Sequence, residues 1–140
     1  MVYFDTSALV PLFILEPKSK ALIDWLESSR EPVVISEWAI VEFAAAMSMK
    51  VRMAQVSSSR AGQARNEFES FAQRECRIFV PDRESFRQAA ALASDPKLKL
   101  RAGDALHLAI ARLLNSSQLA CLDDAMVASA KSLDLEVLTF

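Results

Sequence analysis

Val2-Tyr3-Phe4-Asp5-Thr6-Ser7 opens this chain and contains the pattern that decides its fold. Three apolar or aromatic residues lead directly into a carboxylate and two hydroxyl residues, which is typical of a buried strand that ends and turns into a helix. Short apolar runs of the same kind recur along the sequence. Because they are mostly continuous rather than alternating with polar residues, they predict strands covered on both faces, as in a parallel sheet.

The expected elements alternate between strand and helix along the whole chain. Strands are predicted at residues 2–4, 33–35, 77–80, 119–122 and 136–140. Helices are predicted at 7–15, 18–29, 36–53, 58–74, 83–93, 102–114 and 124–133, with Ser7 and Ser36 as N-caps of the first and third. This order indicates an open three-layer α/β/α domain with a central parallel sheet of about five strands. We expect residues 1–140 to form a single domain.

Composition and charge limit how this chain can be stabilised, what it can bind and in which compartment it is expected. With 140 residues and an apolar fraction of 52%, the chain can bury a core without disulfides or a structural metal. Its net charge of −2 provides no overall attraction for nucleic acid, so RNA binding would need a local basic patch and metal ions. Cys76 and Cys121 lack the spacing of a zinc or redox motif, which indicates reduced thiols. Without a membrane span or signal peptide, the protein is expected to be cytoplasmic.

Three carboxylates stand nearly alone in apolar surroundings, namely Asp5, Glu42 and Asp104. A buried, unpaired carboxylate costs several kcal/mol, roughly, so a shared cation is the simplest compensation. Asp123 ends another predicted strand, and the carboxyl ends of parallel strands share one edge of the sheet. Mg²⁺ and Mn²⁺ prefer such oxygen ligands and can activate water for phosphodiester hydrolysis. The sequence therefore predicts a hard-metal site at that edge.

Four segments resemble the motifs of PIN-domain ribonucleases, especially the VapC toxins of toxin–antitoxin pairs. They are Asp5-Thr6-Ser7-Ala8-Leu9-Val10, Ser36-Glu37-Trp38-Ala39-Ile40-Val41-Glu42-Phe43, Arg101-Ala102-Gly103-Asp104-Ala105-Leu106-His107-Leu108-Ala109 and Leu119-Ala120-Cys121-Leu122-Asp123. Each motif alone is weak. Together they occur in the family's order and spacing over essentially the whole chain, which makes the resemblance specific.

The resemblance implies roles for individual residues. Asp5, Glu42, Asp104 and Asp123 would form the catalytic metal site, and Thr6 would support it by positioning a ligand or water. The family cleaves single-stranded or looped RNA with Mg²⁺ or Mn²⁺. Its VapC members are inhibited by a small VapB-type antitoxin, which would be this chain's only link to DNA, and a homodimer is expected by the same resemblance.

The fourth motif departs from the family pattern at one position. Cys121 stands where the family often has Thr or Ser, two residues before the fourth acid. Asp124 could share or take the role of Asp123, although capping the next helix is its simpler role. His107 lies one turn after Asp104 and is expected to be a packed helix residue with a satisfied hydrogen bond rather than a base or ligand.

Basic residues near the third motif indicate where RNA could lie. Of the lysines and arginines considered, which are Arg60, Arg65, Lys97, Lys99 and Arg101, we expect a substrate role only for the loop Lys97–Arg101, which precedes Asp104. Trp25, Phe68 and Phe71 are expected in the core or in a dimer contact rather than stacked on bases.

Other functions fit the sequence less well. A phosphatase of the haloacid-dehalogenase type needs a second Asp two residues after the first, where Ser7 stands. A receiver domain needs an acidic pair near the first strand and a Lys after the last, and the sequence has neither. A housekeeping PIN nuclease outside a toxin–antitoxin pair, and an RNA-binding PIN-fold domain without activity, remain as alternatives.

Overall fold

A computed structural model describes all residues from Met1 to Phe140. One parallel sheet lies at its centre, built from β1 (Val2–Phe4), β2 (Val33–Ser36), β3 (Cys76–Phe79) and β4 (Gln118–Ala120). The strand order is β3-β2-β1-β4, so the first strand is flanked by the second and the last. The predicted α/β class with a parallel sheet is confirmed.

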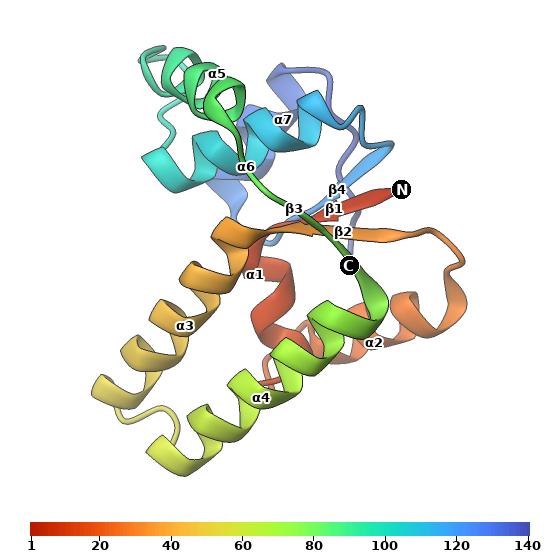
Figure 1. The fold of residues 1–140 in the computed structure, drawn as a ribbon, viewed down its shortest axis with the longest axis vertical. Coiled ribbons are helices and arrows are strands. Elements are labelled where there is room, and N and C mark those ends of the chain that lie inside the picture. Colours follow the sequence, from red (N-terminus) through yellow and green to blue (C-terminus); the bar gives the residue numbers. More distant parts are fainter.

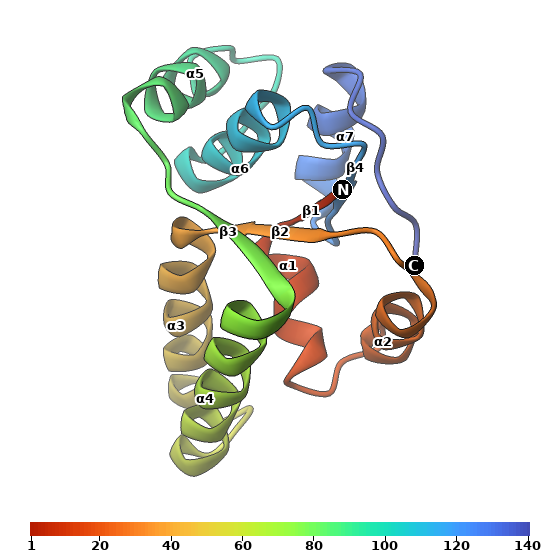
Figure 2. The ribbon, with the colours of Figure 1, turned by 45° about the vertical axis from the view of Figure 1, so that its right-hand side comes forward.

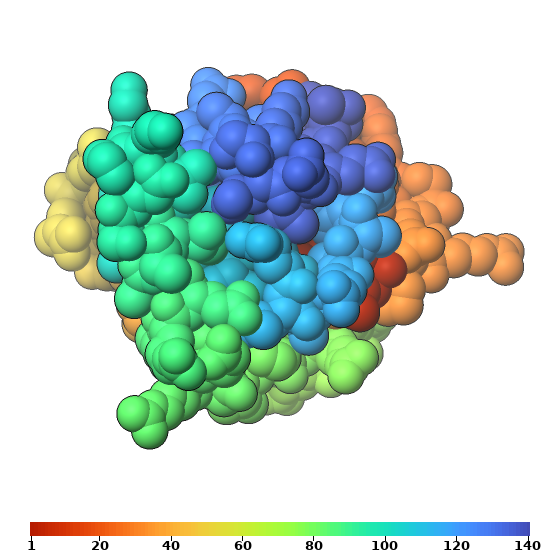
Figure 3. Space-filling view, turned by 90° about the horizontal axis from the view of Figure 1, so that it is seen from above, coloured from red at the N-terminus to blue at the C-terminus, as the bar shows by residue number.

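Helices cover both faces of this sheet (Figure 1). On one face lie α1 (Thr6–Leu9), a 3₁₀ turn η1 (Val10–Leu12), α2 (Ser19–Ser28), α3 (Glu37–Arg52) and α4 (Ser58–Glu75). On the other lie α5 (Arg83–Ala93), α6 (Ala102–Leu113) and α7 (Asp124–Ser132), whose outer surface occupies the middle of Figure 3. The 45° turn of Figure 2 shows the sheet between these two layers of helices.

The alternation of side chains along β1 explains the three layers. Val2 and Phe4 belong to the core beneath α1 to α4, whereas Tyr3 belongs to the core beneath α5 to α7. Successive side chains of a strand point to opposite faces, so an apolar run without polar interruptions is buried on both sides. All three residues are fully buried, as the continuous pattern predicts.

α3 and α4 form an antiparallel pair that extends well beyond the sheet (Figure 1). Phe43 of α3 stacks on Phe68 of α4, with ring centroids 4.1 Å apart and planes inclined by 16°. Phe13 packs edge-on against both of these rings and also against Phe71, which is the fourth ring of the cluster. Trp25 packs on Phe4. These aromatic residues therefore pack in or against the core, as predicted.

Several predicted boundaries differ from the structure. The first helix is not one piece capped by Ser7: Asp5 caps the short α1, and η1 follows because Pro11 has no N–H for an α-helical hydrogen bond. The expected fifth strand is reduced to a single parallel bridge between Leu119 and Val137. Leu119 makes both backbone hydrogen bonds of this bridge: its N–H donates to the carbonyl of Glu136, and its carbonyl accepts from the N–H of Leu138.

Both cysteines are free, as predicted. Burial is the main reason that the pKa of Cys76 is raised to about 12, and it also raises the pKa of Cys121 well above its usual value. Both thiols are therefore protonated at neutral pH and inert. None of the helices has the length and apolar character needed to cross a membrane.

Candidate active site

The two strand-end aspartates lie next to one another at one edge of the sheet. Asp5 follows β1 and Asp123 lies just beyond β4, and these two strands pair with Tyr3 opposite Leu119. The chain runs from β1 outward to β2 and β3, then returns to the other side of β1, so the strand order reverses between β1 and β4. Ligands of open parallel sheets bind in the crevice at such a switch point.

Asp5 is the most deeply buried of the four predicted acids, with 5% of its surface exposed. Its Oδ1 accepts hydrogen bonds from the Ser7 hydroxyl at 2.7 Å and from the Ala8 backbone N–H at 3.3 Å, which caps α1. Ser7 in turn accepts from the backbone N–H of Leu122 at 2.7 Å, linking the ends of β1 and β4. These contacts use one oxygen of Asp5 and leave Oδ2 for a ligand.

Burial raises the pKa of the Asp5 carboxyl above its usual value. Attraction to His107 and the hydrogen bonds from Ser7 and Ala8 lower this pKa but do not cancel the effect of burial. The protein therefore holds a carboxylate whose charge is only partly compensated by its own groups. A cation in the crevice would supply the missing compensation.

Glu42 projects from α3 and has partners on two other elements. Its Oε2 accepts a hydrogen bond from Thr6 Oγ1 at 2.6 Å and lies 2.7 Å from His107 Nε2. Burial on its own raises the pKa of Glu42, but the contacts with His107 and Thr6 outweigh it and hold that pKa below the usual value. The expectation of an isolated, unpaired carboxylate is therefore wrong for Glu42.

Asp104 and Asp123 are held together by one basic residue. Arg101 Nε lies 2.9 Å from Asp104 Oδ2, and its guanidinium Nη2 lies 3.2 Å from Asp123 Oδ2. The Asp104 side chain is largely buried, whereas that of Arg101 is 76% exposed. These two acids are therefore paired as well, and only Asp5 matches the predicted lone buried carboxylate.

The structure also assigns the cap of α7. Asp123, not Asp124, accepts a hydrogen bond from the Met126 backbone N–H at 2.9 Å, so the interpretation of Asp124 as the cap is wrong. Asp124 is the first residue of the helix and contributes nothing to the acidic cavity. Asp123 reaches the cavity because its second oxygen, Oδ2, faces Arg101.

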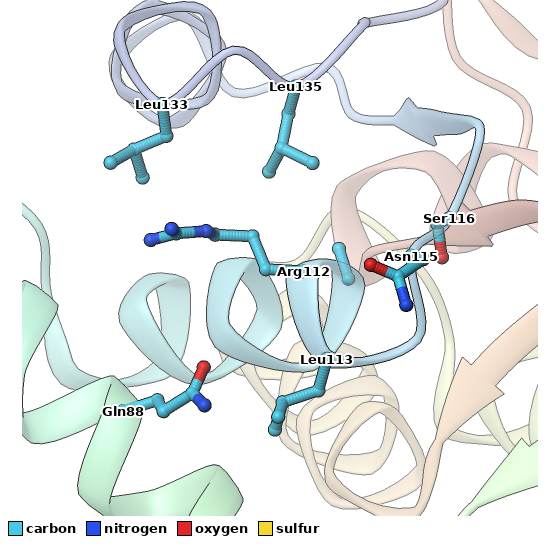
Figure 4. A pocket seen from close by; sticks show the side chains of 8 residues that line it. Gln88, Arg112, Leu113, Asn115, Ser116, Leu133 and Leu135 are labelled. Carbon is cyan, nitrogen blue, oxygen red and sulfur yellow. The ribbon is translucent and has the colours of Figure 1, made fainter.

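One cavity of about 760 Å³ contains all four acids. Its acidic end also includes Thr6, Arg101 and His107, and it continues along α3 past Ala45, Ala46 and Met49 to Lys50 and Arg52. A smaller cavity of about 580 Å³ lies between α5, α6 and α7, where Gln88, Arg112 and Leu133 face one another (Figure 4). It lacks acids altogether, in contrast to the first cavity.

The donor set of the acidic cavity fits a hard divalent cation, because every candidate ligand is a carboxylate oxygen. No three acidic, histidine or cysteine side chains are close enough to share one ion in the described conformation. The ion pairs explain this: Arg101 engages Asp104 and Asp123, while Thr6 and His107 engage Glu42. A cation would therefore replace Arg101 as the counter-charge of two of the four acids.

Several residues of the cavity were not predicted from the sequence. Lys50 forms an ion pair with Glu16 at 2.5 Å, and Arg52 donates a hydrogen bond to the Ser48 hydroxyl. Both basic residues line the far end of the cavity. In the predicted basic loop, only Arg101 reaches the cavity wall. Lys50 and Arg52 follow Glu42 by eight and ten residues on the same helix, a signal that could have placed them further along α3 from the acids.

A family model for the PIN domain matches residues 2–131. The chain therefore belongs to the PIN domain family, which confirms the resemblance drawn from its four motifs. Comparison with curated protein sequences gives no match.

Solved structures with the same fold include toxins of toxin–antitoxin pairs. VapC20 from Mycobacterium tuberculosis, a sarcin-ricin loop cleaving toxin, is 17% identical with a TM-score of 0.71, covering 92% of this chain and 95% of that one. VapBC2 from Rickettsia felis, bound to a promoter DNA fragment, is 15% identical with a TM-score of 0.69 over 99% and 98%. A toxin–antitoxin complex from Klebsiella pneumoniae is 20% identical with a TM-score of 0.67 over 99% and 97%.

Proposed function

We propose that this chain is a metal-dependent endoribonuclease whose single PIN domain hydrolyses RNA phosphodiester bonds in the cytoplasm. The observation that carries the proposal is the convergence of four carboxylates, from four separate elements of a PIN domain, on one cavity. Asp5, Glu42, Asp104 and Asp123 would hold Mg²⁺ or Mn²⁺, with Thr6 supporting Glu42. The bound cation would activate water and offset the charge that develops on the phosphate.

The residues around the acids would contact Glu42 or bind the RNA. Thr6 and His107 each make a hydrogen bond with Glu42 Oε2. Arg101, freed from Asp104 and Asp123 when a cation takes its place, would bind an RNA phosphate beside the acids. Lys50 and Arg52 would contact the phosphate backbone of the RNA further along α3. These two residues would provide the local positive charge for RNA binding that the overall net charge of −2 does not provide.

Cleavage of defined RNAs with Mg²⁺ or Mn²⁺, compared with EDTA, tests the enzyme activity. Asp5→Asn and Asp104→Asn should abolish cleavage in proteins that remain folded by circular dichroism. Asp123→Asn should weaken it strongly, whereas the matched change Asp124→Asn should leave it unchanged, because Asp124 lies outside the cavity. Cleavage that survives both EDTA and the first two substitutions would refute the metal site, and RNA binding without any cleavage would favour the inactive alternative.

We further propose that the protein is the toxin of a toxin–antitoxin pair and that a small VapB-type antitoxin covers the acidic cavity. The complexes from Rickettsia felis and Klebsiella pneumoniae support this proposal by their shared fold. An adjacent short reading frame for a DNA-binding antitoxin, growth arrest on induction and rescue by co-expression would be the expected results. Normal growth with active enzyme present would favour a housekeeping nuclease.

A homodimer is the proposed assembly. Large apolar side chains are exposed on α3 at Val41 and Met49 and on α5 at Phe86, which offers apolar area for contact between copies. Light scattering on the purified protein, before and after the antitoxin is added, measures the number of chains directly.

A further inference from the structure

We infer that His107 is a positioning residue for Glu42 and that the hydrogen bond between Tyr3 and His107 holds the imidazole in the orientation this role requires. The inference rests on the proposed function, because the orientation of Glu42 matters to catalysis only if Glu42 holds the cation. It extends that function to two residues that meet neither RNA nor metal: a histidine of α6 and a tyrosine of β1.

The contact between His107 and Glu42 is short and directional. His107 Nε2 lies 2.7 Å from Glu42 Oε2, and Thr6 Oγ1 lies 2.6 Å from the same oxygen. An ionised carboxylate only accepts hydrogen bonds, so Nε2 carries the proton and donates it. Two donors from different elements thus converge on one carboxylate oxygen and fix its direction.

The imidazole itself is held on its other side. His107 Nδ1 lies 2.7 Å from the Tyr3 hydroxyl, which lies 3.0 Å from Ser36 Oγ. All three residues are buried, with exposed fractions of 1% or less. Ser36 caps α3, the helix that carries Glu42. The chain of hydrogen bonds therefore leaves α3, passes through β1 and α6, and returns to α3 at the carboxylate.

The second oxygen of Glu42 is confined by the backbone of α6. A Cβ built on Gly103 would lie 2.5 Å from Glu42 Oε1 and 3.3 Å from Trp38 Nε1. The indole N–H of Trp38 is buried near Glu42 and also lowers the pKa of this carboxyl, although it makes no hydrogen bond of ordinary geometry. One carboxylate oxygen is thus held by two donors and the other lies against a helix. Loss of His107 would leave Thr6 as the donor to the first oxygen and would not change the contact of the second oxygen with α6.

A histidine that served only to fill the core would show a different signature. Its removal would lower the free energy of unfolding but leave the orientation of Glu42 in folded molecules unchanged. Groups that orient metal ligands typically cost about 10- to 100-fold in metal affinity or activity when they are removed. The experiment must therefore measure the site separately from the fold.

The first measurement uses the metal-free protein and does not depend on activity. The Nε2 proton of His107, the only histidine, should give a slowly exchanging downfield NMR signal with ¹⁵N coupling. Glu42→Gln and Tyr3→Phe should both shift this signal, because each changes one side of the imidazole. A rapidly exchanging proton, or a signal that Glu42→Gln leaves in place, would overturn the inference.

The second measurement compares His107→Leu, His107→Gln and Tyr3→Phe in Mn²⁺ calorimetry and RNA cleavage. We expect His107→Leu to lose about 10- to 100-fold in kcat and Mn²⁺ affinity with the KM for RNA little changed. His107→Gln should recover part of the loss, since its amide can donate near the Nε2 position. Ser85→Ala is the control. This equally buried side chain of α5 donates a hydrogen bond to Asp82 Oδ1 and accepts one from the Asp82 backbone N–H, so its loss should affect stability alone.

The possible failures can be told apart. If wild-type protein cleaves no RNA with Mg²⁺ or Mn²⁺, the proposed ribonuclease is wrong, while the proton spectrum still decides whether His107 holds Glu42. If the wild type cleaves and the folded His107→Leu and Tyr3→Phe variants match it in kcat and Mn²⁺ affinity, the positioning role is wrong. Tyr3→Phe keeps the ring and its packing, so it reports even if His107→Leu does not fold.

Discussion

Replacing one glycine by alanine should separate the activity of this protein from its stability. Gly103 and Gly62 both lie within helices, but a Cβ on Gly62 meets no atom within 4 Å, whereas a Cβ on Gly103 lies 2.5 Å from Glu42 Oε1. Alanine in a helix is favoured over glycine by about 0.5–1 kcal/mol. Gly62→Ala should therefore raise the free energy of unfolding by that amount and leave RNA cleavage unchanged.

Gly103→Ala should instead displace the Glu42 carboxylate. The oxygen must move by about 0.9 Å to reach an ordinary contact distance of 3.4 Å, and it is the end of a flexible side chain, so the fold can accommodate the change. The displacement strains the hydrogen bonds from Thr6 and His107, which as bonds to a charged group contribute roughly 1.5–3 kcal/mol each. The helix gain should be cancelled, and cleavage should fall about 100-fold, as misplacements of about 1 Å do.

Urea unfolding and single-turnover RNA cleavage, run on wild type and both alanine variants, test this reasoning. The expected order of stability places Gly62→Ala above the wild type and Gly103→Ala at or below it. If Gly103→Ala gains as much stability as Gly62→Ala and cleaves RNA at the wild-type rate, the close approach of α6 to Glu42 is wrong, and so is its catalytic relevance.

Three further predictions concern charge and packing. Asp5→Asn should stabilise the metal-free protein against urea at pH 7, because burial raises the pKa of Asp5. In the wild type, ionisation of the buried carboxyl lowers the free energy of unfolding; this loss is absent below the usual Asp pKa of about 3.9 and grows as the pH rises above it. The difference in stability between the two proteins should therefore vanish in acid. Arg101→Gln should change stability by less than about 1 kcal/mol, while calorimetry should show tighter Mn²⁺ binding and the KM for RNA should rise; the small change in stability follows from the 76% exposure of the Arg101 side chain, not from exposure of its partner Asp104. Phe68→Ala should cost about 3–5 kcal/mol of unfolding free energy, against less than about 0.5 kcal/mol for the half-exposed Phe86→Ala, and a Phe68→Ala variant as stable as wild type would contradict the described packing.

The order of elements could be read from the sequence because its signals are local. A strand buried on both faces needs only a few consecutive apolar residues, and its end is marked by a capping residue, as at Asp5 and Ser36. The fifth strand was overestimated for the same reason. Residues 136–140 have an apolar pattern, but only one bridge joins Val137 to the sheet, and the number of partners a strand finds is not a local property.

The sequence marked each of the four acids as a candidate and the structure places all four in one cavity, but their partners could not be predicted. Tyr3 and His107 are separated by 104 positions in the chain, and His107 and Glu42 by 65. His107 was expected to be a packed residue with a satisfied hydrogen bond, and it is one, yet the identity of its partner gives it a place beside the site. The pairing of Arg101 with Asp123 across 22 positions is likewise invisible in the motifs.

The sequence alone determined that this chain forms a parallel α/β domain with acids at its strand ends, because β propensity, apolar runs and caps act over a few neighbouring residues. Only the tertiary structure decided that β4 returns beside β1, which brings Asp123 to Asp5 and opens the crevice. It alone decided how the acids are compensated, with Asp5 left buried and Glu42 held by Thr6 and His107. Electrostatic compensation depends on distances of a few ångströms between residues far apart in the chain, and only folding sets those distances.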